Sequence, residues 1–274
     1  MNKIVPIVKW AGGKRQLLSD LLPMIPTDFS TYYEPFIGGG AVLFELQPKK
    51  AVINDTNSEL INLYRVTKEE PNELIREIKL HENAHSQDYY YSVRDLDRNQ
   101  AVFARLSPIE RAARTVYLNR ACYNGLYRVN KDGCFNTPMG RNSSICFVNE
   151  TDIFAISEYL NQNSIRILEG DYKGALKYAR KSSFVFLDPP YYPVGDEYFL
   201  RYDRTMFGVK QQYELKAICD SLTQRGIRFI ETNSDCDEVR KLYNNYQQTV
   251  VEARRSINAN PNERRTTELI ISNY

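Results

Sequence analysis

Phe184-Val185-Phe186-Leu187-Asp188-Pro189-Pro190-Tyr191 is the stretch that decides the predicted fold and chemistry of this chain. Its four apolar residues predict a buried strand, and the polar end of such a strand is a usual place for a ligand. The Asp188 carboxylate and the Pro189 carbonyl can each accept one hydrogen of a planar amino group, and the two prolines keep that backbone rigid. Tyr191 offers a flat face for a base. A simple strand-ending turn uses the same residue types, so the rest of the chain must decide between the two interpretations.

The composition is that of an ordinary globular protein. Of the 274 residues, 42% are hydrophobic and 26% are charged, and the net charge is only +2. No apolar run approaches the length of a membrane span, and the N-terminus lacks a signal-peptide core, so we expect a cytoplasmic protein that does not contact a membrane. The five cysteines contain no Cys-x-x-Cys pair, which argues against a zinc ribbon.

Strand-like segments alternate with helical patterns on both sides of Asp188. The predicted strands are Tyr32–Phe36, Lys50–Ile53, Ile165–Leu168, Ser183–Leu187 and Gly226–Ile230, the last followed by Thr232-Asn233-Ser234. This alternation predicts an α/β protein with a parallel sheet. The last two apolar runs, Gln248–Ala253 and Thr267–Ser272, have no helix between them, so they predict an antiparallel hairpin joined by a polar loop from Arg254 to Arg265.

The segment from Asn57 to Asn161 is charged and helical in pattern and interrupts the alternation. We therefore predict a catalytic domain formed by residues 1–56 and 162–274, with an inserted domain at 57–161. Tyr117 to Gly140 is rich in Asn, Gly and Tyr and predicts an extended loop or hairpin, centred on about 120–140. Five basic residues and one acid between Arg114 and Arg141 suit a polyanionic partner.

Two glycine turns in the first 55 residues suggest a small-molecule site. Phe36-Ile37-Gly38-Gly39-Gly40 would let a ligand approach the backbone, and Asp55 ends the next strand, where an acid can bind ribose hydroxyls. The spacing lacks the dinucleotide fingerprint, so a nucleoside without pyrophosphate fits better. In Trp10-Ala11-Gly12-Gly13-Lys14, Lys14 could face the carboxylate of a zwitterion. A plain turn and a core Trp are the alternatives.

These motifs follow a fixed order, with the glycine turns first and Asp188 near the end. The set is Lys9-Trp10-Ala11-Gly12-Gly13-Lys14, Glu34-Pro35-Phe36-Ile37-Gly38-Gly39-Gly40, Asn54-Asp55, Asn119-Arg120-Ala121-Cys122-Tyr123-Asn124-Gly125-Leu126-Tyr127-Arg128, Phe135-Asn136-Thr137-Pro138-Met139-Gly140, Gly170-Asp171, Asp188-Pro189-Pro190-Tyr191 and Thr232-Asn233-Ser234. In combination and order it resembles the Dam-like DNA adenine-N6 methyltransferases, in the group called alpha.

The resemblance implies a fold, a cofactor and a set of residue roles. The fold would be a Rossmann-like S-adenosylmethionine-dependent methyltransferase sheet with an antiparallel C-terminal hairpin and an inserted, mainly helical DNA-recognition domain. The cofactor would be S-adenosyl-L-methionine, bound by Trp10, Lys14, Phe36, Gly38, Asp55, Asp171 and Asp188. The catalytic residues would be Asp188, Pro189 and Tyr191.

The resemblance also implies double-stranded DNA as the partner. Contacts with it would come from Lys9, Arg120, Tyr123, Asn124, Leu126, Arg128, Asn136 and Pro138. Tyr123 would insert into the duplex, Asn124 would meet the orphaned or flipped base, and Arg128 and Lys9 would each read a guanine, which suits the two acceptors on that base. GATC is the expected target; another short adenine target is the alternative.

The implied reaction is methyl transfer to adenine N6 after base flipping. It would need no metal, because the sulfonium is already an activated methyl donor. Cytosine-N4 chemistry uses a similar site, usually with Ser in place of Asp188. The sequence leaves open whether the protein works with a cognate restriction endonuclease, alone or in a phage. It also leaves open whether the protein is a monomer or a weak dimer, how processive it is and whether it prefers hemimethylated sites.

Two further functions remain as alternatives. His81-Glu82-Asn83-Ala84-His85 matches the H-E-x-x-H pattern of zinc metalloproteases, although its polar flanks suit an exposed helix end better than a buried zinc helix. A DNA-binding protein that has lost catalysis would keep the basic segment with a decayed cofactor site, but every predicted cofactor residue is chemically intact.

Overall fold

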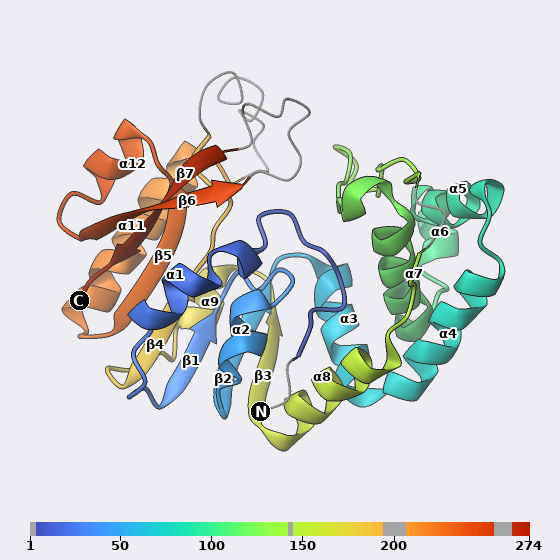
Figure 1. The fold of residues 1–274 in the computed structure, drawn as a ribbon, viewed down its shortest axis with the longest axis horizontal. Coiled ribbons are helices and arrows are strands. Elements are labelled where there is room, and N and C mark those ends of the chain that lie inside the picture. Colours follow the sequence, from blue (N-terminus) through green and yellow to red (C-terminus); the bar gives the residue numbers. More distant parts are fainter. Residues whose placement is uncertain (1–3, 142–144, 194–206, 255–264) are drawn as a thin grey trace. The chain divides into compact units, whose positions relative to one another are not determined.

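The computed structural model describes residues 4–141, 145–193, 207–254 and 265–274, without the side chains of 254, 265 and 266. Seven strands form one sheet in the order β3-β2-β1-β4-β5-β7-β6 (Figure 1). Their bounds are β1 Thr31–Glu34, β2 Lys50–Asp55, β3 Ser164–Glu169, β4 Ser183–Leu187, β5 Arg228–Ser234, β6 Gln247–Arg254 and β7 Arg265–Ser272.

Helices connect most of these strands. They are α1 Leu18–Leu21, α2 Ala41–Leu46, α3 Ser58–Glu69, α4 Pro71–Asn83, α5 Gln87–Asp95, α6 Gln100–Phe103, α7 Pro108–Ala121, α8 Glu150–Gln162, α9 Tyr172–Leu176, α11 Val209–Gln224 and α12 Asp237–Leu242. Single 3₁₀ turns lie at Lys14–Gln16, Leu22–Met24, Leu96–Arg98 and Tyr123–Gly125. Within the described residues, no helix is long and apolar enough to span a membrane.

The chain divides into two compact units. The first unit comprises Met1–Gly13, Gly38–Gln47 and Asp55–Gly170, and the second comprises Lys14–Ile37, Pro48–Asn54 and Asp171–Tyr274. The predicted insertion at 57–161 is helical, as expected, with α3, α4, α7 and α8 packed around residues such as Leu60, Leu74 and Val116, which are at most 1% exposed. Its role as an inserted recognition domain stays a prediction.

The second unit holds the centre of the sheet. Strand β1 pairs in parallel with β2 and β4, and β4 pairs in parallel with β5. All five residues of β4 are buried, as expected for a central parallel strand covered on both faces. Strand β7 then pairs antiparallel with both β5 and β6, which confirms the predicted C-terminal hairpin. Residues 255–264 of its predicted polar loop lie outside the described residues.

Three predicted boundaries were wrong. The predicted strand Tyr32–Phe36 ends at Glu34. Thr232-Asn233-Ser234 was expected after its strand, but β5 continues through Ser234 because these polar residues pair with β7, in the register Thr232↔Ile270. The loop expected from Tyr117 begins only at Cys122, since the capping box of Ser107 and Glu110 starts a helix whose buried face extends through Ala121.

Candidate active site and nucleic-acid interface

Asp188 follows the last residue of β4, at the carboxyl end of the parallel strands. Its Oδ1 lies 2.6 Å from the Lys14 Nζ and accepts a hydrogen bond of 2.8 Å from the Thr232 hydroxyl. Burial raises the pKa of Asp188, and Lys14 and Thr232 oppose that rise by stabilising the carboxylate. Neither Asp188 Oδ2 nor the Pro189 carbonyl accepts a hydrogen bond from a described residue. Two acceptors therefore remain for a ligand.

Tyr191 is fixed on both its hydroxyl and its ring. The hydroxyl donates to Glu268 Oε2 on β7 at 2.5 Å, and the Lys14 Nζ lies 4.8 Å from the ring centroid. Burial, with the nearby Asp188 and Glu268 carboxylates, raises the pKa of Tyr191 well above its usual value. Tyr191 is therefore a neutral phenol at physiological pH. The structure thus brings the predicted residues Lys14, Asp188 and Tyr191 together.

Phe36 and Asp171 lie near each other in the same unit. The Phe36 ring packs on Tyr172 at a centroid distance of 5.1 Å and meets Phe207 edge-on. Asp171 is exposed and caps helix α9, where its Oδ1 accepts a hydrogen bond from the Lys173 amide at 2.7 Å. The half-buried ring beside an exposed carboxylate is compatible with the predicted nucleoside site.

In the first unit, Asp55 stabilises the glycine turn. Its Oδ2 accepts a hydrogen bond of 3.1 Å from the Gly38 amide, and its Oδ1 accepts one of 2.9 Å from Asn57. Gly38 has φ of +48°, and a Cβ added there would lie 2.9 Å from Trp10 Cδ1. Only glycine satisfies both conditions, which keeps the backbone open at this point. A carboxylate has about four acceptor positions, so Asp55 can still bind hydroxyl groups.

The predicted hairpin is held by few backbone contacts. Isolated bridges pair Cys122 with Met139 and Val129 with Phe135. The Asn136 amide donates to the Arg128 carbonyl, and the Phe135 amide donates to Asp97 Oδ2 at 2.8 Å. That same carboxylate oxygen lies 2.9 Å from Nη2 of the buried Arg114. The hairpin is therefore anchored to the helical part of the first unit through Asp97.

Lys9 is joined to this region through Asn119. The Asn119 amide group accepts from the Lys9 N–H and donates to the Lys9 carbonyl, each at 2.8 Å. It also donates to the Gly125 carbonyl at 3.0 Å. Arg120 takes a different direction, because its Nη2 donates to the Ile7 carbonyl at 2.5 Å and burial lowers its pKa. Lys9 is exposed, whereas Arg120 is half-buried.

The remaining predicted DNA contacts are mostly at the surface. Tyr123 is 50% exposed, and Asn124 beside it adopts a left-handed conformation with φ of 54°. The Arg128 Nε donates to Asn136 Oδ1 at 2.8 Å, which extends the exposed guanidinium in a fixed direction. The Pro138 carbonyl accepts from the Tyr123 amide, and the Leu126 carbonyl accepts from the Thr137 hydroxyl.

The two histidines form an aromatic cluster. Helix α4 ends at Asn83, so His85 lies beyond it and the pair does not share one helical face, contrary to the zinc alternative. The Nδ1 atoms of His81 and His85 bond the hydroxyls of Tyr89 and Tyr117, respectively. Burial lowers the pKa of His81 to about 4. Over the described part of the chain, no three His, Cys, Asp or Glu side chains are grouped to hold a metal ion.

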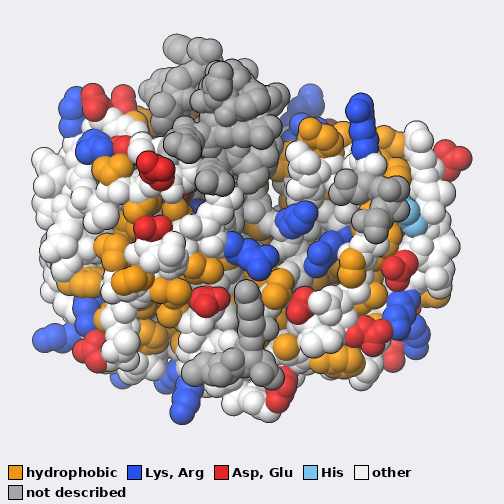
Figure 2. Space-filling view, in the orientation of Figure 1, with side chains coloured by type: hydrophobic (Ala, Val, Ile, Leu, Met, Phe, Trp, Pro, Cys, Tyr) orange, Lys and Arg blue, Asp and Glu red, His pale blue; other side chains and the backbone are white. Residues whose placement is uncertain are grey.

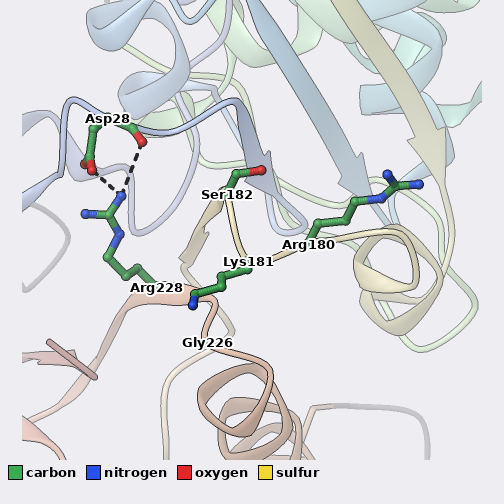
Figure 3. A pocket seen from close by; sticks show the side chains of 6 residues that line it. All are labelled: Asp28, Arg180, Lys181, Ser182, Gly226 and Arg228. Atoms are coloured by element: carbon green, nitrogen blue, oxygen red, sulfur yellow. Dashed lines mark hydrogen bonds and ion pairs between the residues drawn. The ribbon is translucent and has the colours of Figure 1, made fainter.

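A shallow depression lies elsewhere in the second unit. It is lined by Asp28, Arg180, Lys181, Ser182, Gly226 and Arg228, and Arg228 forms an ion pair of 2.7 Å with Asp28 (Figure 3). Asp28 precedes β1, Arg180, Lys181 and Ser182 precede β4, Gly226 precedes β5 and Arg228 is its first residue, so the depression lies at the amino ends of these strands, opposite to Asp188. Basic and acidic side chains are both scattered over the face shown in Figure 2, in keeping with the near-neutral net charge.

Four residues of this site were not assigned a role from the sequence. Thr232 and Asn119 belong to motifs quoted above. Their polar side chains were the only sign in the sequence that they could form hydrogen bonds in the site. Glu268 was marked only by being an acid directly before the apolar residues Leu269–Ile271 of the last strand. Tyr127 stacks on Trp10 with ring centroids 4.8 Å apart, a pairing that no local sequence pattern indicates.

Comparison with known proteins gives a consistent result. A family model for D12 class N6 adenine-specific DNA methyltransferases matches residues 10–257. The chain is 42% identical over 271 residues to a Type II methyltransferase, M1.LlaDCHI, of Lactococcus lactis subsp. cremoris, covering 98% of this chain and 95% of that protein. It is 36% identical over 293 residues to the Type II methyltransferase M.MjaIII of Methanocaldococcus jannaschii, covering 99% and 100%. It is 32% identical over 278 residues to the DNA adenine methylase of Escherichia coli K12, covering 100% and 96%.

Proposed function

We propose, because the chain belongs to the D12 class of N6 adenine-specific DNA methyltransferases, that it methylates adenine N6 within GATC, using S-adenosyl-L-methionine. One observation carries the chemical part of this proposal. Asp188 Oδ2 and the Pro189 carbonyl, at the end of β4, are two acceptors without a described donor. A planar amino group has two hydrogens to donate, so the pair matches an adenine N6 group.

The residues of each unit fit the proposed cofactor. In the first unit, Trp10, Gly38 and Asp55 combine an aromatic ring, an open backbone and a carboxylate with spare acceptor capacity. In the second unit, Phe36 and Asp171 offer a ring and an exposed carboxylate, and Lys14 would hold the methionine carboxylate. S-adenosylmethionine supplies the methyl group as part of a sulfonium. Lys14 would then divide its charge between that carboxylate and Asp188.

The protein would activate the adenine by removing its amino group from conjugation. When Asp188 and Pro189 accept both N6 hydrogens, the nitrogen becomes more pyramidal and its lone pair is free to attack. Positioning of this kind contributes about 7–11 kcal/mol in well-oriented reactions. The base must first leave the duplex, which costs a few kcal/mol. Stacking on Tyr191, fixed by Glu268 and Lys14, would offset about 1–3 kcal/mol.

Target recognition is assigned to exposed residues of the first unit. Lys9 and Arg128 would each read a guanine, and Tyr123 and Asn124 would occupy the space that the flipped base leaves. Leu126, Asn136 and Pro138 would complete the hairpin surface. Arg120 would support the hairpin surface through the chain segment at Ile7, because its guanidinium donates a hydrogen bond to the Ile7 carbonyl. Because two relatives are named Type II methyltransferases, we extend the proposal to protection against a cognate restriction endonuclease.

Labelled S-adenosylmethionine provides the first test. One duplex carries a single GATC, and a second has its adenine replaced by 2-aminopurine, which lacks the N6 amino group. We expect label only on the first. Label on both would contradict adenine N6 as the acceptor. Label on neither, together with transfer to a duplex pool of random sequence, would contradict GATC while keeping the reaction.

Arg128→Ala is expected to relax discrimination at one guanine by about 1–3 kcal/mol, because the bidentate contact with O6 and N7 is lost. Transfer rates on single-base variants of GATC measure the change. Lys131→Ala provides a matched control, since Lys131 is exposed in the same hairpin. This substitution should change the transfer rate on all duplexes equally. An unchanged preference in Arg128→Ala would contradict the assigned role.

A further inference from the structure

Gln212 is a fully buried amide next to the catalytic motif. It lies in the first turn of α11 and is 0% exposed. Its Nε2 donates to the Pro190 carbonyl at 2.8 Å, and its Oε1 accepts from Asn233 Nδ2 at 3.0 Å. Glutamine is mostly a surface residue, and a buried amide is tolerated when its hydrogen bonds are satisfied. Both the Nε2 and the Oε1 atom of Gln212 therefore have a hydrogen-bond partner.

Asn233 continues the connection from β5 to the other side of the motif. It is 0% exposed, and its Oδ1 accepts from the Tyr192 amide at 2.9 Å. Its Nδ2 also donates to Glu231 Oε1 at 3.0 Å. The Ser234 hydroxyl adds a bond of 2.8 Å to the Tyr192 carbonyl. The backbone is thus held immediately before and after Tyr191.

We propose that Gln212 and Asn233 are positioning residues that clamp the Asp188-Pro189-Pro190-Tyr191 turn in the geometry needed for methyl transfer. This inference rests on the proposed function of Asp188 and Pro189. Proline has no N–H, so the carbonyl of Pro190 is the one main-chain hydrogen-bonding group through which that residue can be held. Gln212 holds that carbonyl, and Asn233 holds the amide of Tyr192, two residues further along the chain.

The clamp matters for the reaction because the two acceptors come from neighbouring residues. Thr232, adjacent to Asn233 on β5, holds Asp188 from the same strand. A shift of the turn relative to β5 would separate the Pro189 carbonyl from the Asp188 carboxylate. Displacements of about 1 Å in reacting groups can reduce rates by about 10²-fold. The clamp should therefore affect the chemical step more than the binding of either substrate.

Gln212→Met keeps the size of the side chain and removes both hydrogen bonds. We expect its single-turnover transfer rate to fall by about tenfold to hundredfold, with DNA and cofactor dissociation constants within about threefold of wild type. Hydrogen exchange of the Tyr192 amide should become faster at the same time, since the Asn233 side chain loses its support. Leu222→Ala is the matched control: Leu222 is a buried core residue later in the same helix and makes no side-chain hydrogen bond to the turn.

The outcomes separate the clamp from a merely structural role. A rate loss in Gln212→Met that exceeds that of Leu222→Ala, with faster exchange at Tyr192, supports the clamp. An unchanged rate, or an equal loss in the two variants, overturns it. If Gln212→Met does not fold, Gln212→Asn keeps the polarity but shortens the reach, and the same comparison applies. If the wild-type chain transfers no methyl group, the proposed function fails, whereas the exchange measurement still tests whether Gln212 and Asn233 hold the turn.

Discussion

Asp188→Asn should reduce methyl transfer by about 10³-fold or more while leaving DNA binding nearly unchanged. The substitution keeps the shape of the side chain and removes its charge. Where Oδ2 would accept an adenine hydrogen, an asparagine can instead present an N–H group, which repels the N6 hydrogens. Loss of a single catalytic hydrogen-bonding group costs about 10²–10³ in rate, and here a repulsive contact replaces it.

Single-turnover transfer to a GATC duplex measures this effect, with binding followed separately by titration. Asp220→Asn is a suitable control, because Asp220 belongs to the same unit and also pairs with a lysine, Lys216, at 2.7 Å. Asp220 is distant in the chain from Asp188, so the Asp220→Asn variant should transfer methyl groups at nearly the wild-type rate. Near-normal turnover in Asp188→Asn would contradict the mechanism proposed for the site.

The family, the α/β fold and the C-terminal hairpin could be predicted from the sequence. The matching family model confirms the family, and the observed strand order confirms the fold and the hairpin. The reason is physical: a buried parallel strand such as Ser183–Leu187 must be apolar throughout, and a glycine with positive φ such as Gly38 has few substitutes. These requirements act on adjacent residues, so they leave local patterns. Element ends were less predictable, because polar residues such as Thr232 can extend a strand when a neighbouring strand pairs with them.

The supporting contacts of the site could not be predicted in the same way. Glu268 bonds Tyr191 across 77 positions, and Asn119 bonds Lys9 across 110. Such pairs depend on where the fold places two distant segments, and each partner alone fits many other roles. The pairing of Lys14 with Asp188 also differs from the expected one, since Lys14 was assigned only to the cofactor. In this structure it stabilises the charge of the Asp188 carboxylate.

Glu231 makes the stability of the second unit depend on pH. Burial raises its pKa from about 4.5 to about 7, although Asn233 and Cys219 donate hydrogen bonds to it. The nearby titratable groups are Cys219 and Tyr243, both with raised pKa values, and the more remote Lys216. The folded state therefore binds a proton more tightly than the unfolded state. The contribution of Glu231 to the free energy of unfolding is fully present below about pH 4.5 and is lost as the pH rises through about 7.

Glu231→Gln should remove this dependence and keep the hydrogen bond from Asn233. At about 1.4 kcal/mol per pH unit between pH 4.5 and 7, the wild type should lose roughly 3 kcal/mol relative to the variant. Urea unfolding of both proteins from pH 4.5 to 9 measures the difference, which should level off above about pH 8. Glu214→Gln is the control: Lys173 lowers the pKa of the exposed Glu214, so its effect should be small and opposite in sign. Parallel stability curves for the wild type and Glu231→Gln would show that the buried carboxyl ionises as freely in the folded chain as in the unfolded one.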